Sequence, residues 1–327
     1  MRAFLLAALL CAAPPLSRAA MYGARQAGTS AAQFLILGAD ARAAGMGGAA
    51  SASADDATAI YWNPADLAGL HYRHATLTHS ASYQSTFRDF VAYAQPIESR
   101  RGGRTRGPEP DQLGVIGAAL QYQNAGRIDE LDNAGAATGS SFAPQDFAAT
   151  VGWGTELVRD RLDAGLSVKY VSSSIEAGAT TGAADFGARF RAQLPDTEID
   201  YALSAALRNV GGPLKFRDAS DPLPMSAVIG QALRPLRSLT IAVDVNAPRD
   251  AAPYVSFGVE WRAPMTEGLT ASLRAGRDGR LQSTGAGGSS GITCGGGLGF
   301  QRLAFDYAWT PSGDLGDTQL LTLSYRF

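Results

Sequence analysis

Three histidines are the side chains best suited to bind a metal ion or to move a proton. His71, His74 and His79 are the only histidines of the chain and lie close together. On a strand, His71 and His79 share one face while His74 points to the other, so the three imidazoles cannot converge on one metal without a bend. Ser-His-Asp catalysis would have to be built at the same place. We therefore expect no metal site and no cofactor, and we expect that the protein is not an enzyme.

A glycine-rich stretch, Gly45-Met46-Gly47-Gly48-Ala49-Ala50, fits a loose dinucleotide-binding pattern. A genuine fingerprint of that kind directly follows a strand and opens a helix within a βαβ unit. Here small residues separate the stretch from the nearest apolar run, and no alternation of strands and helices follows. The formal net charge of −2 also argues against a nucleic-acid partner. Neither nucleotides nor nucleic acids are expected ligands.

Four arginines form the densest run of charge: Arg100, Arg101, Arg104 and Arg106. They lie in a long polar stretch before residue 112. One interpretation is a solvated loop that needs no partner. The other is a basic docking loop for an acidic protein or a lipid phosphate. The sequence leaves both open.

The start of the chain has the pattern of a secretory signal peptide. The charged Arg2 is followed by an apolar run and by a small-x-small cleavage site that ends at Ala19. We expect residues 1–19 to be removed, which also removes Cys11 and leaves Cys294 without a partner for an internal disulfide. No other segment offers ~20 unbroken apolar residues, which excludes helical membrane spans.

From His71 onward, apolar and polar residues alternate in long stretches. Strict alternation indicates a strand with one apolar and one polar face. A soluble sandwich hides the apolar face inside, whereas a membrane barrel turns it toward lipid. A strand length of ~10 residues favours a tilted crossing of the bilayer. In two examples, Leu162, Ala164, Leu166, Val168 and Tyr170 alternate with Asp163, Gly165, Ser167 and Lys169, and Leu303, Phe305, Tyr307 and Trp309 alternate with Arg302, Ala304 and Asp306.

The polar face of these strands carries ionisable groups at mid-strand. In a barrel such groups face a wet lumen. Residues 71–327 accommodate about 14 strands, and we predict an all-β fold, a transmembrane antiparallel β-barrel in contact with outer-membrane lipid. The charges expected to face the lumen are Lys169, Arg189, Glu260, Arg274 and Asp306.

The lengths of the connections support this interpretation. Bacterial barrels have longer outer loops and short periplasmic turns, and an even number of strands puts both ends in the periplasm. A short connection near Gln84 and a long one near 97–111 break the alternation. Long polar stretches are expected near 123–144, 172–182, 209–223 and 277–290, and tight turns near 157–160, 234–237 and 301.

The end of the chain reads as a closing membrane strand. Leu321, Leu323, Tyr325 and Phe327 alternate with polar residues, and the last residue is aromatic. Such a strand is the usual recognition signal for barrel-assembly machinery. We therefore expect an exported protein that is inserted into the outer membrane, with Tyr325 and Phe327 as the insertion signal.

Residues 20–70 do not alternate, and we interpret them as a hatch that precedes the barrel. Proline fixes φ and pushes the preceding residue away from helix, so Asn63-Pro64 predicts a turn. Tyr61 and Trp62 would wedge against inward-facing residues, and glycines 45, 47 and 48 would let the backbone lie close to the wall. Ala65 completes the predicted turn. An open alternative is that Asn63 lines a path for conduction or a ligand.

Nearly the whole mature chain resembles the PorV/PorQ family of outer-membrane proteins, relatives of the fatty-acid transporter FadL. The resemblance implies a barrel of fourteen strands whose lumen is partly filled by an N-terminal hatch. Its most specific block lies between residues 41 and 65. The matching elements are Phe34-Leu35, Gly38, Ala41-Arg42, Met46-Gly47-Gly48-Ala49, Asp55-Asp56, Tyr61-Trp62-Asn63-Pro64-Ala65, Asn209-Val210-Gly211, Leu223-Pro224, Gly258-Val259-Glu260, Tyr307-Ala308-Trp309, Asp314-Leu315-Gly316 and Phe327.

Two functions follow from the resemblance. PorV/PorQ relatives are associated with type IX secretion, which implies an adaptor, shuttle or anchor that binds secretion-system or cargo proteins. The FadL relationship implies instead a transporter of hydrophobic small molecules across the outer membrane. The charges expected in the lumen argue against an apolar interior that would suit a hydrophobic substrate, and they thus favour the adaptor.

Overall fold

The computed structural model describes residues 28–98, 112–175, 177–195, 197, 199–217, 219–283, 291–311 and 316–327. The expected signal peptide, residues 1–19, lies outside this part of the chain. Fourteen antiparallel strands close into one barrel, as the sequence predicts. In ring order they are β1 (His74–Ala81), β18 (Asp317–Arg326), β17 (Leu303–Pro311), β16 (Ile292–Phe300), β15 (Leu269–Arg277), β14 (Tyr254–Thr266), β13 (Leu239–Pro248), β12 (Ser226–Leu236), β9 (Asp200–Gly211), β8 (Gly178–Gln193), β7 (Leu162–Ser174), β6 (Gln145–Val158), β3 (Gln112–Asn124) and β2 (Phe87–Glu98).

The first and last strands in the sequence, β1 and β18, pair and close the ring. His74 on β1 lies opposite Arg326 on β18, and the pairing continues to Ala81 opposite Gln319. With this seam, no strand of the barrel keeps an unpaired edge, which is the condition for a sheet to persist in a bilayer. No helix in the described part of the chain has the length and apolar character needed to cross a membrane.

Alternation along the strands places the apolar side chains outside. On β1, the Leu77 side chain is 49% exposed while Thr78 is 2% exposed and faces the interior. Val168, Phe257 and Phe305 are likewise exposed on their strands. The apolar face therefore points toward lipid and the polar face toward the lumen, as predicted for a membrane barrel.

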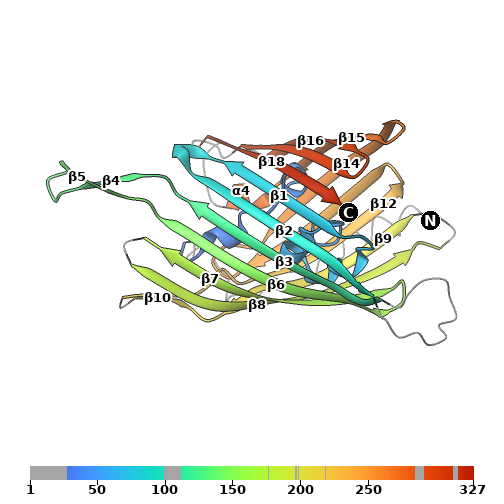
Figure 1. Cartoon of the computed structure of the whole chain (residues 1–327), viewed down its shortest axis with the longest axis horizontal. Helices are drawn as coiled ribbons and strands as arrows, with labels where there is room; N and C mark the ends of the chain where they lie inside the picture. Colours follow the sequence, from blue (N-terminus) through green and yellow to red (C-terminus); the bar gives the residue numbers. More distant parts are fainter. Residues whose placement is uncertain are drawn as a thin grey trace.

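The two ends of the barrel differ in their connections (Figure 1). One end carries the long excursions, including the β4–β5 hairpin (Ile128–Leu131, Ala137–Phe142), the β10–β11 pair (Leu214–Phe216, Ala219–Asp221) and the helix α4 (Gly279–Ser283). The C-terminus and the tight turns lie at the other end. Because short turns are periplasmic in bacterial barrels, we call the end with the excursions the outer end and the opposite one the turn end.

The prediction of a long loop near 172–182 is wrong. β7 continues to Ser174 and β8 begins at Gly178, so the two strands form one long hairpin. Ser172 pairs with Thr180 and Ser173 with Ala179 in regular register. The small polar residues there continue the ladder beyond the length that crosses the membrane, where neither face has to be apolar.

The hatch, residues 28–70, lies inside the ring (Figure 1). It contains four short helices: η2 (Gln33–Ile36), α2 (Ala41–Gly45), α3 (Ala59–Trp62) and η3 (Pro64–Gly69); a further one-turn helix, η4 (Tyr83–Ser85), joins β1 and β2. Ile60 and Leu67 are completely buried, and they belong to a cluster with Phe90, Val115 and Ala119 on the wall. The hatch thus forms an apolar core together with β2 and β3.

Inward-facing glycines let the hatch backbone lie directly on the wall. A Cβ at Gly154 would lie 2.6 Å from the carbonyl oxygen of Pro64, and one at Gly165 or Gly187 would overlap the same turn. At a second contact, side chains at glycines 258 and 276 would overlap the backbone at Met46 and Gly47. Only residues without a side chain allow two backbones to approach this closely. We call these two contacts the glycine seats of the hatch.

Candidate functional site at the hatch

The Asn63-Pro64 turn is fixed to the barrel by the amide of Asn63. Its Oδ1 accepts a hydrogen bond from the Ala65 N–H (3.1 Å), and its Nδ2 donates to the carbonyl oxygens of Ser51 (3.0 Å) and Ala188 (3.4 Å). Pro64 begins η3, where its missing N–H costs nothing. Asn63 is 0% exposed, and its side chain caps η3.

Tyr61 and Trp62 anchor the other side of the turn. The Trp62 indole N–H donates to the Asp40 carboxylate (2.7 Å), and the Tyr61 hydroxyl accepts from the Gly38 N–H (2.9 Å). The Tyr61 ring meets Phe90 of β2 edge-on at 5.9 Å. Asp40 also caps α2 by accepting from the Ala43 N–H (2.8 Å). Burial raises the pKa of Asp40 to about 6.

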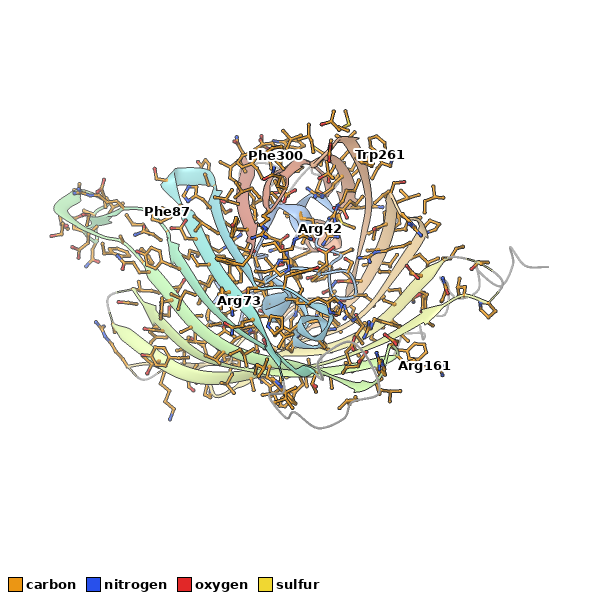
Figure 2. The ribbon with its side chains drawn as sticks, turned by 45° about the vertical axis from the view of Figure 1, so that its right-hand side comes forward. Arg42, Arg73, Phe87, Arg161, Trp261 and Phe300 are labelled. Atoms are coloured by element: carbon orange, nitrogen blue, oxygen red, sulfur yellow. The ribbon has the colours of Figure 1, made fainter. Side chains whose placement is uncertain are left out.

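A chain of ion pairs crosses from the hatch to the wall at Arg42, which lies inside the barrel in Figure 2. Its guanidinium binds Glu260 of β14 with two hydrogen bonds of 2.9 and 2.8 Å, and Asp55 of the hatch with one of 2.9 Å. Arg274 of β15 donates to Glu260 (2.8 Å) and to Asp306 of β17 (2.5 Å). Two-point guanidinium–carboxylate contacts of this kind fix orientation as well as distance.

The remaining two of the five expected lumen charges lie on the opposite wall. Arg189 of β8 donates through Nε to Asp163 of β7 (2.9 Å), and its Nη1 lies 3.2 Å from Asp66 of the hatch. Lys169 of β7 contacts Asp185 at 2.7 Å and donates to Asn209 (2.7 Å). All five charges are buried inside the ring. Arg189, Glu260 and, through Glu260, Arg274 bind the hatch, whereas Lys169 holds β7 to β8 and β9.

This architecture agrees with the comparison to known sequences. The sequence profile described as "Type IX secretion system protein PorV" matches residues 21–221. The chain belongs to the PorV family. No curated protein sequence gives a significant match.

Solved structures similar to this PorV family member include a channel, a transporter and a FadL homologue. The deltaS2S3 mutant of the monoaromatic hydrocarbon channel TodX has a TM-score of 0.56 at 13% identity, covering 88% of this chain and 98% of that one. The toluene transporter TbuX of Ralstonia pickettii has 0.51 at 12%, covering 90% and 100%. A FadL homologue of Pseudomonas aeruginosa has 0.50 at 10%, covering 88% and 98%. At these identities the likeness shows the fold alone.

Several residues that hold the hatch were not assigned a role from the sequence. Arg42 and Asp55 lie in the most specific block of the family resemblance, but nothing in their spacing shows that they form a pair. Asp163, Asp185 and Asp244 stand on the polar face of alternating strands, as the selected charges do. Asp244 accepts hydrogen bonds from the N–H groups of Ala50 (3.1 Å) and Ser51 (3.0 Å). The sequence pattern that identifies these aspartates is the same as for the selected charges: an ionisable residue on the polar face of an alternating strand.

Asp66 predicts a pH-dependent hatch. Burial raises its pKa to about 8 despite Arg189, and neither carboxylate oxygen accepts a hydrogen bond among the described residues. Since the folded state then holds a proton that the unfolded state releases at a pH of about 4, the attachment is strongest at low pH and weakens as pH rises through 8. We expect Asp66→Asn to reduce the loss of hatch stability between pH 6 and pH 9, measured as protease resistance of residues 28–70.

The matched control is Asp129→Asn, because Asp129 is exposed on the β4–β5 hairpin. That variant should keep the slope of the wild-type chain. An unchanged slope in Asp66→Asn would show that another group titrates.

The hatch separates cavities at the two ends of the lumen. At the outer end a cavity of about 180 Å³ lies against Leu37, Gly38 and Trp62; we call it the outer cavity. At the turn end, cavities of about 440 and 330 Å³ flank Asp55. The first of these reaches Asp66 and Arg189, and the second reaches Arg274 and Asp306.

The other residues noted in the sequence lie at the C-terminus, on the exposed surface of the barrel or outside the described residues. Phe327 donates its N–H to the carbonyl of Arg73 (2.9 Å), and its ring contacts Tyr325 edge-on at 4.7 Å. The basic docking loop with Arg100, Arg101, Arg104 and Arg106 lies outside the described residues. His79 pairs with Asp89 (2.7 Å) on the exposed surface, and no cluster of metal-binding side chains occurs in the described ranges.

Proposed function

We propose that the chain is an outer-membrane adaptor that binds protein partners in a type IX-like secretion system. The match to the PorV profile over residues 21–221 carries this proposal. The interior adds support. A lumen closed by a hatch with buried ion pairs on two walls is suited to a barrel that presents surfaces to proteins. Export by a signal peptide at 1–19 and recognition of β18 by assembly machinery belong to the same proposal.

Transport of hydrophobic small molecules is the second candidate. The similar solved structures include a monoaromatic hydrocarbon channel and a toluene transporter, which gives this candidate the support of a shared fold. A hydrophobic molecule crossing this lumen would have to displace the hatch. It would also separate Arg42 from Glu260 and pass charged side chains on both walls. Separating buried ion pairs is costly, and we therefore favour the adaptor.

A disulfide that locks the hatch distinguishes the two functions. The hydroxyl oxygens of Ser51 on the hatch and Ser204 on β9 are 3.1 Å apart and buried. Cysteines at these positions would need only a small shift to form a bond of ~2.05 Å. We expect the oxidised Ser51→Cys/Ser204→Cys chain, in a Cys294→Ser background, to restore surface delivery of secreted proteins to a strain that lacks the wild-type chain.

Transport would give a different result. If the chain carries toluene or a similar hydrocarbon, its uptake should stop on oxidation and return on reduction, while loss of the chain should leave protein secretion unchanged. The single variants Ser51→Cys and Ser204→Cys control for the substitutions themselves. Secretion that is independent of the chain would contradict the adaptor.

A further inference from the structure

The outer cavity is lined by an excess of positive charge. Three arginines reach it from separate elements: Arg88 from β2, Arg208 from β9 and Arg280 from α4. Asp278 is the one carboxylate among the described residues that line it. Asp278 is already engaged by Arg280, accepting from its backbone N–H (2.9 Å) and contacting its guanidinium at 3.4 Å. Among the described residues, two guanidinium groups therefore face the cavity without a carboxylate to neutralise them there.

Arg208 is the least satisfied of these groups. It is only 9% exposed, and its Nε has no hydrogen-bond partner among the described residues. Its guanidinium carbon lies 5.9 Å from the Tyr61 ring and 5.8 Å from the Trp62 ring, distances at which aromatic faces stabilise a cation. Asp244 interacts electrostatically with Arg208 but forms no ion pair with it among the described residues; its Oδ2 accepts the N–H groups of Ala50 and Ser51, and its Oδ1 has no hydrogen-bond partner there. Buried charges in proteins are normally paired and hydrogen-bonded.

Arg88 of β2 also lines the cavity with its charge unpaired among the described residues. It is buried, and its Nη2 donates to the carbonyl oxygen of Leu37 (2.9 Å). No ion pair of Arg88 or Arg208 occurs in the described part of the chain. A backbone carbonyl satisfies one donor of a guanidinium but does not neutralise its charge. The hatch holds both arginines in place, since it supplies Leu37 to one and two aromatic rings to the other.

We propose that the outer cavity binds an oxyanion group, a carboxylate or a phosphate, between Arg208 and Arg88. A planar guanidinium presents paired N–H donors that match the two oxygens of such a group. Arg280 adds a third positive charge, and Asn246 and Tyr254 line the same space. A volume of about 180 Å³ admits a small acid or the charged end of a larger molecule, but no long chain. The hatch closes the cavity toward the turn end, so the ligand enters from the outer end.

Titration of the purified full-length barrel in a nonionic detergent tests this site, with inorganic phosphate, acetate and glycerol 3-phosphate as probes in a buffer of low ionic strength. Calorimetry should detect binding of phosphate or acetate. Arg208→Gln should weaken that binding at least ~10-fold, because a charge-assisted contact to the anion is lost. Stronger binding of glycerol 3-phosphate than of phosphate would identify a phosphorylated headgroup as the source, and equal binding a free anion.

A second pair of variants keeps the test decisive if Arg208→Gln does not fold. Asn246→Asp places a carboxylate in the same cavity, and it should also reduce phosphate binding at least ~10-fold by neutralising the arginines. Arg127→Gln is the control, because Arg127 is exposed on the β4–β5 excursion away from the cavity. The proposal is overturned if the wild-type barrel binds none of the probes, or if Arg208→Gln and Asn246→Asp bind them as tightly as Arg127→Gln does.

Discussion

Replacing Glu260 by glutamine is expected to lower the free energy of unfolding by about 3–5 kcal/mol, the usual cost of removing one partner from a buried ion pair. Glu260 accepts hydrogen bonds from Arg42 and Arg274 and, at 3.2 Å, from Arg262. Glutamine has nearly the same shape, so the change removes charge without creating a cavity. Three guanidinium groups then share the remaining carboxylates. Urea unfolding in detergent, with protease sensitivity of residues 28–70, measures the effect.

Two comparisons make this result specific. Glu156→Gln changes a partly exposed carboxylate that pairs with Arg191 at the turn end, and it should cost at most about 1 kcal/mol. Adding Arg42→Gln to Glu260→Gln should cost less than the sum of the single changes, because it removes one unneutralised charge. Equal losses for Glu260→Gln and Glu156→Gln would show that this ion pair does not hold the hatch.

Adding a single methyl group under the Asn63-Pro64 turn should dislodge the hatch. A Cβ at Gly165 would overlap the Pro64 carbonyl group and the Ala65 nitrogen, and a Cβ at Gly187 would overlap the Asn63 amide. Neither glycine has a positive φ, so alanine is compatible with the strand conformation. The expected loss of stability therefore comes only from the overlap between the added methyl group and the turn. We expect Gly165→Ala and Gly187→Ala each to cost about 1–3 kcal/mol as overpacked sites, with earlier proteolysis of the hatch.

Gly182→Ala provides the control on the same strand as Gly187. A Cβ there would meet nothing closer than the Lys169 carbonyl oxygen at 3.8 Å, an ordinary contact. Its unfolding should match that of the wild-type chain. If Gly165→Ala and Gly187→Ala leave both unfolding and proteolysis unchanged, the turn does not rest on these glycines.

The barrel could be predicted from the sequence because its strands obey one local rule. In a membrane barrel every strand residue faces either lipid or lumen. Apolar and polar residues therefore alternate along each strand, as they do around Val168 and Phe305. The rule stops applying where a hairpin leaves the bilayer. At Ser172 and Thr180 the side chains are small and polar on both faces, and the sequence there reads as a loop although the ladder continues.

The site was less predictable because it joins segments far apart in the chain. The charges at Lys169 and Glu260 could be assigned to the lumen by their place in an alternating strand. Their partners could not, since Arg42 and Asp66 lie in a hatch whose short helices have no regular period. The close contact between Gly187 and Asn63 is likewise a property of two surfaces, and neither segment shows it alone.

The glycine seats also bear on the order in which the protein is built. The seats lie on opposite arcs of the ring, one on β6, β7 and β8 and the other on β14 and β15, and the hatch rests on both. The seam between β1 and β18 joins the first strand made to the last. The contacts at the glycine seats leave no room for side chains between the turn and the wall. We therefore expect the hatch to bind the wall while the sheet is still open, so that the last strand pairs with the first around a hatch already in place.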